Sequence, residues 1–427
     1  FPSKIKNVIS IFCYGGVSHI DTFDPKPALF KHAGEALTGD RAVKPSQGHP
    51  GGLMPSPWEF KKHGQSGMEV SSLFPHVAKH VDDIAFIRSM YSLSNDHAPA
   101  LYQMNTGFIL PGHPSMGSWL TYGLGTENQN LPAFIVFTDW RGGPIGGAPN
   151  WGNGFMPAAY QGTQFRSTGD PIVDLTPRGA PTFDAARDRQ RKWLDLLGKL
   201  NEEHLAKYPD ESELSARIGA YELAFRMQVA APDATDLTKE SEATRRSYGL
   251  DQKQTEYFGR QALMARRLIE RGVRYVQIFS GGGNFTESWD AHFSLRENHE
   301  MHCGETDQPT AALLSDLKAR GLWDSTLVIW HGEFGRLPIT QRGDGRDHNP
   351  YGFTVWLAGG GIKGGTVVGS TDEFGLRAEE NKKSVNDLHA TILHLMGFDH
   401  TRLTYYHNGR QMRLTDVSGE VIRPILA

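Results

Sequence analysis

Short runs of apolar and β-branched residues recur along the chain, and segments with helical spacing of apolar positions separate them. Strands are predicted at six such runs: 7–14, 84–89, 132–138, 273–279, 326–330 and 353–358. The run at 326–330 is apolar throughout, as expected of a strand that is buried on both faces of a sheet. Alternation of strands with helices is typical of parallel sheets. The sequence therefore predicts an α/β fold with a mostly parallel central sheet flanked by helices.

Helical spacing predicts short helices at 74–81, 99–106, 115–122, 309–320 and 385–396, and amphipathic helices within 184–228 and 252–271. Glycine and proline gather in 34–67, 141–181 and 343–365. Apolar strand candidates occur near both ends of the chain. We therefore predict a single domain over residues 1–427, with long surface loop insertions near 34–67 and 141–181 and a helical insertion near 184–271.

Composition narrows the classes of function. The 427 residues are 38% hydrophobic and 22% charged, with a net charge of -4, so we expect no nucleic-acid partner, and no apolar run is long enough for a membrane span. Cys13 and Cys303 do not resemble a disulfide framework. Oligomeric state stays open. The chain begins at Phe1, just before the first strand, which suggests that a leader has been removed.

Acidic and histidine residues follow the predicted strands. Glu333 lies in a glycine-flanked turn after the strand at 326–330, and Asp347 and His348 precede the strand at 353–358. Both loops should open at the strand end where α/β sheets bind ligands. Oxygen and nitrogen donors at such an edge are typical of a metal-dependent hydrolase. The alternative is a set of local hydrogen bonds within turns.

Two further loops carry such pairs. Asp290 and His292 follow a glycine-rich turn, with His299 and His302 as alternatives that could equally be surface histidines. His19 and Asp21 follow the first strand, where Asp21 could instead cap the next turn. Oxygen-rich ligation with some imidazole suits one or two divalent cations, whether zinc, manganese, magnesium or calcium. The predicted metal ligands are His19, Asp21, Asp290, His292, Glu333, Asp347 and His348.

The predicted substrate contacts lie near the same loops. Asn95, Asp96 and His97 precede the proline that opens a helix, where helix amides attract anions, although Asp96 could simply be the N-cap. Guanidinium groups can bind a tetrahedral oxyanion, although each arginine could instead form a surface ion pair. Aromatic faces can stack on sugar rings, although these side chains could instead form a hydrophobic cluster under a long loop. The candidates are Arg88, Arg336 and Arg346 for the anion and Trp140, Trp151 and Tyr160 for the sugar.

The order of these motifs resembles the alkaline phosphatase superfamily and, within it, the sulfatases. The segment His97-Ala-Pro-Ala-Leu-Tyr-Gln-Met-Asn-Thr-Gly107 has the proline and Thr-Gly spacing of the sulfatase nucleophile helix. Residues 326–335 resemble the sulfatase strand that ends in Ser-Asp-His-Gly, and 358–368 with 387–393 resemble its closing segments. The resemblance implies an alkaline phosphatase-like fold and ester hydrolysis.

A closer resemblance covers residues 15–398. An exported, sulfatase-like bacterial family, domain of unknown function 1501, typically carries Gly-Gly-x-Ser-His-x-Asp-x-Phe-Asp-Pro-Lys-Pro, Gly-Glu-Phe-Gly-Arg and Gly-Arg-Asp-His. Here these motifs are residues 15–27, 332–336 and 345–348. Members often have a twin-arginine leader, so the resemblance implies a periplasmic or secreted protein.

The chain departs from sulfatases at two positions that the resemblance makes informative. His97 occupies the slot of the formylglycine precursor, which excludes that mechanism, and Phe334 stands where a metal-binding histidine is usual. His97 is then expected to be either the nucleophile or an acid/base that assists cation-activated water, with Asp96 and Arg336 as further catalytic candidates. The predicted function is hydrolysis of a carbohydrate sulfate ester. The alternatives are a phosphomonoesterase or phosphodiesterase and a silent carbohydrate-binding protein.

Overall fold

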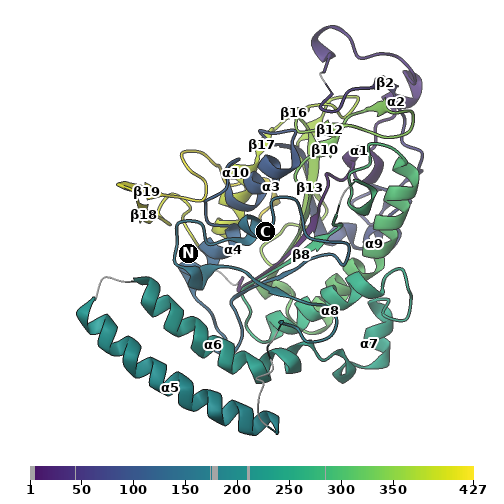
Figure 1. Cartoon of the computed structure of the whole chain (residues 1–427). Coiled ribbons are helices and arrows are strands. Elements are labelled where there is room, and N and C mark those ends of the chain that lie inside the picture. Colours follow the sequence, from purple (N-terminus) through teal and green to yellow (C-terminus); the bar gives the residue numbers. More distant parts are fainter. Residues whose placement is uncertain (1–4, 44, 174, 176–180, 209–211, 284) are drawn as a thin grey trace.

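A computed structural model of the chain describes residues 5–43, 45–173, 175, 181–208, 212–283 and 285–427. Within these residues a nine-stranded sheet has the order β14-β5-β13-β9-β1-β8-β6-β7, and β17 pairs with β5 (Figure 1). The strands are β1 (Asn7–Cys13), β5 (Ile84–Tyr91), β6 (Phe134–Phe137), β7 (Thr163–Phe165), β8 (Tyr275–Ser280), β9 (Thr326–His331), β13 (Phe353–Gly359), β14 (Thr366–Val368) and β17 (Lys383–Ser384).

The direction of one strand decides where the loops of the site open. β13 runs antiparallel to both β5 and β9, whereas the other paired strands of the sheet run parallel. The amino end of β13 therefore lies at the edge where β1, β5, β8 and β9 have their carboxyl ends. The prediction of a mostly parallel α/β sheet flanked by helices is confirmed.

Helices cover both faces of the sheet, because side chains of a strand alternate between the two faces. Ile9 and Ile11 of β1 pack in the core beneath α8 (Glu256–Glu270) and α9 (Leu295–Ala319). Val8 and Phe12 pack in the opposite core with α3 (His97–Thr106), α4 (Met116–Leu124) and α10 (Val385–Leu395). β1 is buried along its whole length. β1 is thus packed on both of its faces, and the loop that follows it begins directly at this buried strand.

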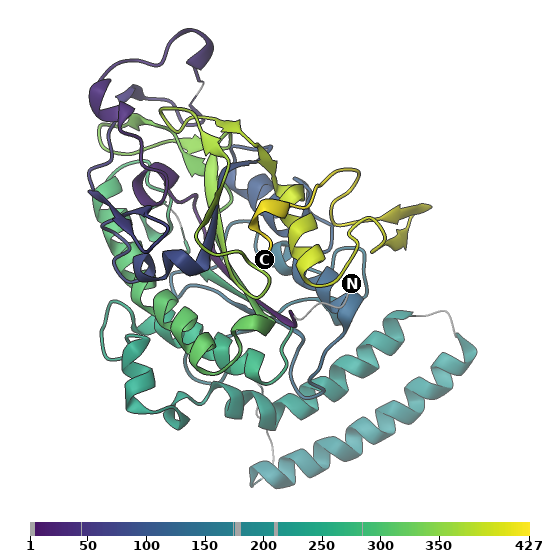
Figure 2. The same ribbon diagram turned by 180° about the vertical axis from the view of Figure 1, so that it is seen from behind.

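The helical insertion includes a hairpin that projects from the body of the molecule. α5 (Phe183–Lys207) and α6 (Ser212–Thr235) lie side by side, as Figures 1 and 2 show from opposite directions. Arg191 of α5 binds Glu222 of α6 at 2.7 Å. None of the described helices combines the length and apolar character that crossing a membrane requires. The assignment of all 427 residues to one domain remains a prediction.

Several elements differ from the sequence expectation. α9 begins at Leu295, so Pro309 lies inside the helix rather than in its first turn. α3 begins at His97 instead of residue 99. Residues 77–83 form the 3-10 helix η2 (Val77–Asp83). The segment 141–181 contributes the edge strand β7 in addition to loops.

The remaining elements are short and lie mostly in the connections. They are α1 (His19–Thr22), α2 (Ala28–Lys31), η1 (Gly39–Arg41), β2 (Pro50–Leu53), β3 (Phe60–His63), β4 (Met68–Ser71), η3 (Ala148–Trp151), η4 (Ala158–Tyr160), η5 (Leu237–Lys239), α7 (Glu242–Ser247), η6 (Phe285–Glu287), η7 (Trp323–Ser325), β10 (Gly335–Arg336), β11 (Ile339–Gln341), β12 (His348–Asn349), β15 (Ser370–Thr371), β16 (Ala378–Glu380), β18 (Tyr405–His407), β19 (Arg410–Met412) and η8 (Arg423–Ile425).

Candidate metal centre

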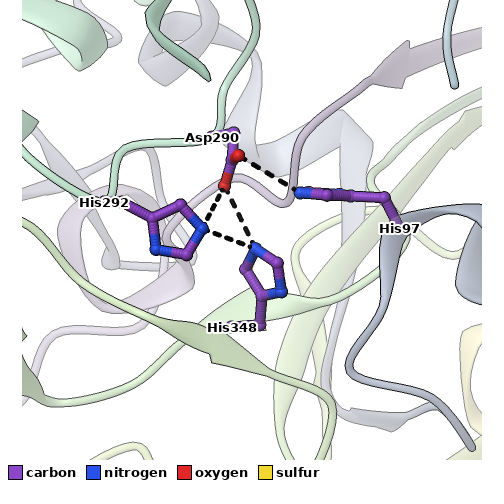
Figure 3. Close-up of side chains that lie close together, drawn as sticks. All are labelled: His97, Asp290, His292 and His348. Atoms are coloured by element: carbon purple, nitrogen blue, oxygen red, sulfur yellow. Dashed lines mark hydrogen bonds and ion pairs between the residues drawn. The ribbon is translucent and has the colours of Figure 1, made fainter. Parts of the chain in front are cut away.

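Three histidines and one aspartate meet at the carboxyl edge of the sheet. Asp290 and His292 lie in the connection from β8 to α9, His97 is the first residue of α3, and His348 belongs to β12, just before β13. One potential ligand atom from each of the four lies within 4.8 Å of the others. Figure 3 shows His292 and His348 directed at one oxygen of Asp290 while His97 approaches the other. Segments far apart in the chain therefore build one candidate site.

Glycines in the sequence motifs allow these loops to approach closely. Gly15 has a φ of +113°, and a Cβ there would lie 2.6 Å from the backbone nitrogen of Asp290. A Cβ on Gly345 would lie 2.0 Å from the carbonyl carbon of His292. Contacts this short cannot accommodate a side chain, so only glycine lets the two loops pack against the 290–292 segment. The motif glycines thus fix the backbone that carries the ligand candidates.

Three contacts among Asp290, His292 and His348 join atoms that carry lone pairs when each neutral ring has its proton on Nδ1. The Asp290 Oδ1 atom lies 3.0 Å from His292 Nε2 and 3.1 Å from His348 Nε2. The two Nε2 atoms are 2.9 Å apart. A proton on either nitrogen could serve only one of these contacts.

The other nitrogen of each ring decides the tautomer. His348 Nδ1 lies 2.6 Å from the carbonyl oxygen of Asn95, and His292 Nδ1 lies 2.5 Å from the side-chain oxygen of Gln341. An oxygen acceptor requires Nδ1 to carry the proton, so both Nε2 atoms are left as acceptors. Burial lowers the pKa of His348 to about 3, so that this ring is neutral. Three lone pairs therefore converge, and the donor set of two imidazoles and a carboxylate fits a divalent cation such as zinc or manganese.

His97 approaches the group from the opposite side. Its Nδ1 lies 2.7 Å from Glu333 Oε1, and its Nε2 lies 3.3 Å from Asp290 Oδ2 without forming a hydrogen bond. Glu333 also accepts the Gly15 backbone N–H at 2.9 Å. Burial alone would lower the pKa of His97, but the neighbouring carboxylates of Asp290 and Glu333 raise it to about 9. His97 is partly exposed, whereas the other three members are buried, and its Nε2 atom is buried against the group.

Arg336 forms an ion pair with Asp290. Its guanidinium is fully buried and donates to Asp290 Oδ1 at 2.6 Å and to the carbonyl oxygens of Gly16 at 2.7 Å and Arg346 at 2.9 Å. It also donates to the carbonyl oxygen of Gly15. Burial would raise the pKa of Asp290, but Arg336 and the surrounding histidines hold it well below its usual range. The sequence predicts that Arg336 binds the substrate anion. All three of its guanidinium nitrogens have protein partners, and one of these partners is the Asp290 carboxylate.

Glu333 and Asp347, both predicted as metal ligands, lie beside the four-residue group and bind its members. Asp347 accepts hydrogen bonds from Ser46 Oγ at 2.7 Å and from the Gln47 backbone N–H at 3.0 Å. It also accepts one from Gln341 Nε2 at 3.3 Å, and Gln341 in turn holds His292. Sequence reasoning did not single out Ser46 or Gln341, because neither lies in a motif and their partners are distant in the sequence.

The predicted ligands of the first loop lie outside the four-residue group. Arg346 Nε donates to Asp21 at 2.7 Å, and both side chains are fully buried. His19 Nε2 faces the carbonyl oxygen of Gly375 at 2.8 Å instead of Asp21. His299 accepts the Ser18 backbone N–H at 3.2 Å. The group of Ser18, Asp21, His299 and Arg346 is called the arginine-bound cluster below.

The other predicted site residues are dispersed. Arg88 lies on β5, where its guanidinium approaches Asp24 at 3.9 Å. Asp96 is the exposed N-cap residue of α3 and forms no side-chain capping bond. Trp151 is 7% exposed and packs on Phe279, and Tyr160 packs edge-on against Tyr122, whereas Trp140 is 66% exposed. His302, named as an alternative ligand, is buried and faces the carbonyl oxygen of Ser288 at 2.9 Å.

The fold and the histidine–carboxylate group at its edge define an α/β protein with a candidate metal centre. Residues 5–426 match the model of a family described as a protein of unknown function, DUF1501, and the chain belongs to that family. The family predicted from the motifs is thereby confirmed. A search among curated proteins gave no match.

Solved structures with a related chain path include sulfatases and a phosphatase. A complex of Ps i-CgsB with k-i-k-neocarrahexaose has a TM-score of 0.40 and 10% identity, over 92% of this chain and 72% of that one. The PsFucS1 sulfatase from Pseudoalteromonas sp. has a TM-score of 0.38 and 13% identity, over 96% and 74%. A mutant of TAB5 alkaline phosphatase has a TM-score of 0.39 and 11% identity, over 93% and 99%. Likeness at this level is too weak to carry a function.

Proposed function

We propose that this protein is a metal-dependent hydrolase of sulfate esters on carbohydrate, with a divalent cation held by Asp290, His292 and His348. The observation that carries the proposal is the convergence of Asp290 Oδ1 and two Nε2 lone pairs, with contacts of 2.9–3.1 Å and each Nδ1 proton directed at an oxygen acceptor. When bound, the cation supplies a Lewis acid that draws charge from the ester oxygen. The resemblance of the motifs to sulfatases supports the reaction class.

We assign to His97 the role of nucleophile or of acid/base toward the substrate. The Nδ1–H of His97 donates to Glu333, so Nε2, the nitrogen beside Asp290, carries the lone pair once the ring has given up its second proton. That lone pair either attacks sulfur, in which case the sulfur–oxygen ester bond breaks and the leaving alcohol oxygen takes a proton from water, or it takes a proton from the water that attacks sulfur. Glu333 then stabilises the positively charged ring that forms. Acid/base catalysis of this kind contributes about a hundred- to ten-thousand-fold. His97 also opens α3, whose amino end favours a negatively charged group.

The number of cations favours a sulfate over a phosphate monoester. Asp290, His292 and His348 form one group of converging donors, which suits a single divalent cation. A sulfate monoester carries one negative charge, whereas a phosphate monoester carries two and would need a further cation. A periplasmic or secreted location, which the family resemblance implies, would expose the enzyme to sulfated polysaccharides.

The decisive experiment is a matched assay on purified protein of known metal content. Aryl sulfate and aryl phosphate with the same leaving group are compared first, followed by a panel of sulfated polysaccharides. We expect release of sulfate that chelation abolishes and that added zinc or manganese restores. Release of phosphate but never of sulfate would replace this proposal with the phosphoesterase alternative.

The variant His97→Gln separates the roles of the histidine. We expect it to retain metal and to lose turnover by orders of magnitude, since glutamine can keep a polar contact but cannot act as a base or as this nucleophile. Loss of metal together with turnover would make His97 a fourth ligand. Near-native turnover would remove it from the reaction. Binding of sulfated sugar without turnover in metal-loaded wild-type protein would indicate a silent carbohydrate-binding protein.

A further inference from the structure

A cavity opens at the same edge of the sheet, two strands away from β9. It has a volume of about 560 Å³ and is called the side pocket here. Its walls include Asp139, Trp140 and Arg141, which follow β6, together with Ser280 at the end of β8 and Glu305 of α9. β6 and β8 are neighbouring parallel strands. The side pocket therefore lies where α/β sheets bind ligands, next to the loop that carries Asp290.

Short contacts tie the side pocket to the metal-centre loop. Asp139 accepts the Gly281 backbone N–H at 3.1 Å. A Cβ on Gly282 would lie 2.1 Å from the carbonyl oxygen of Gly142, so the two loops touch through their backbones. Trp289 Nε1 donates to Ser280 Oγ at 3.2 Å, and Trp289 directly precedes Asp290. A ligand in the side pocket would thus contact the same packed segment that positions the metal ligands.

The charges of the side pocket disfavour an anion. The Arg141 guanidinium binds Asp139 at 2.8 Å and Glu305 at 2.7 Å, so one buried cation is shared by two carboxylates. Lys253 on the rim is exposed and therefore well solvated. Four hydrogen bonds already occupy the Asp139 carboxylate, so Glu305, which binds Arg141 through Oε2, is the carboxylate that can accept hydrogen bonds from hydroxyl groups. The polar wall suits a neutral, hydroxyl-rich ligand.

Aromatic rings provide the other half of the lining. Trp140 is 66% exposed, and the Arg141 guanidinium lies 5.3 Å from its ring centroid. Tyr257 is partly buried and donates its hydroxyl to the carbonyl oxygen of Thr138 at 3.2 Å, which fixes its ring. Aromatic faces beside a few fixed polar groups are the usual lining of small-molecule sites. Aromatic faces with carboxylate acceptors match the apolar C–H faces and the hydroxyls of a sugar ring.

We propose that the side pocket binds an uncharged sugar unit of the substrate chain, while the esterified unit lies at the metal centre. The link to the substrate rests on the proposed function, but the binding of a neutral sugar does not. The acidic lining of the side pocket would hold the neutral part of the glycan, and the cation and the amino end of α3 would hold the sulfate. The side pocket would then select for length and backbone of the glycan, not for sulfation.

Binding of neutral sugar to metal-stripped full-length protein tests the pocket separately from catalysis. The probes are hexasaccharides of desulfated galactan, desulfated fucan and mannan, and binding is measured by calorimetry and ligand-observed NMR. We expect at least one to bind and Trp140→Ala to weaken it about tenfold. Trp193→Ala is the matched control, because Trp193 is 61% exposed on α5, away from the side pocket, and should leave binding unchanged.

Three outcomes would overturn the assignment. None of the neutral hexasaccharides binds, Trp140→Ala has no more effect than Trp193→Ala, or only sulfated sugars bind and Lys253→Ala weakens them. The last outcome would make the pocket an anion subsite. If the enzyme hydrolyses sulfated oligosaccharides, Trp140→Ala should raise KM on them more than Trp193→Ala does. Failure of sulfate release would remove the proposed function without affecting the binding result.

Discussion

The metal centre and the arginine-bound cluster both lie at the carboxyl edge of the sheet, and they differ in what surrounds their carboxylate. Asp21 is bound at both oxygens by the guanidinium of Arg346, at 2.7 and 3.2 Å. Asp290 receives one guanidinium nitrogen from Arg336 but faces imidazole nitrogens at both oxygens. A carboxylate held by a bidentate guanidinium has its charge balanced within the protein. A carboxylate facing imidazole nitrogens that act as acceptors leaves converging lone pairs that a cation would satisfy.

The comparison also separates two uses of histidine. His299 in the arginine-bound cluster accepts the Ser18 N–H at 3.2 Å, so its Nε2 lone pair already has a partner. His292 and His348 each use Nδ1 on an oxygen acceptor and direct Nε2 at Asp290. A ring whose acceptor nitrogen is satisfied by the backbone stabilises the fold. A ring whose acceptor nitrogen faces a carboxylate and a second imidazole nitrogen is suited to bind a metal.

The largest expected effect is on turnover and metal content. His348→Ala should remove one converging donor, lower metal occupancy and reduce sulfate release by at least about a hundredfold, because water is a poor replacement for a buried ligand. Asp21→Asn is the matched control and should keep its metal. Elemental analysis and single-turnover assays measure the two quantities. Full occupancy in His348→Ala together with native turnover would exclude this histidine as a ligand.

For the free energy of unfolding, we expect a large loss when the arginine-bound cluster is changed. Asp21→Asn leaves the buried Arg346 without its charge partner, which costs about 3–5 kcal/mol for a buried pair. Asp195→Asn removes a partner of Arg191 on the exposed α5, where a pair contributes at most about 1 kcal/mol. Chemical denaturation of metal-free proteins gives both values. A loss below 1 kcal/mol in Asp21→Asn would show that the arginine-bound cluster is not a structural ion pair.

Sequence reasoning could find the fold and part of the site because both depend on local pattern. The buried strand at 326–330 is a run of β-branched and apolar residues, and Asp290 with His292 stands out after a glycine-rich turn. The same reasoning treated Asp21 like Asp290, because the partner that distinguishes it, Arg346, lies more than three hundred residues away in the chain. The reversed direction of β13 and the start of α9 at Leu295 also depend on tertiary packing, which no local pattern records.

Metal addition should stabilise the folded protein once the cation concentration exceeds its Kd. A ligand at one hundred times its Kd stabilises the folded state by about 2.7 kcal/mol. Wild-type protein should therefore show a higher Tm with added zinc or manganese than after chelation. His292→Ala should lose most of this increment, whereas Asp21→Asn should keep it despite its lower starting Tm. Equal increments in all three proteins would indicate that the cation binds elsewhere.

The smallest effect is a pH dependence that belongs to the arginine-bound cluster. Burial lowers the pKa of His299 to about 3. Since the unfolded ring has a pKa near 6.5, the unfolded state binds the extra proton between these values, and stability falls as pH falls through that window. The loss amounts to about 2 kcal/mol between pH 7 and pH 5. His299→Gln cannot titrate, so the gap between wild type and variant should narrow by this amount in acid. The exposed control His49→Asn should leave the acid-side slope unchanged, and a parallel slope in His299→Gln would mean that His299 is not the group responsible.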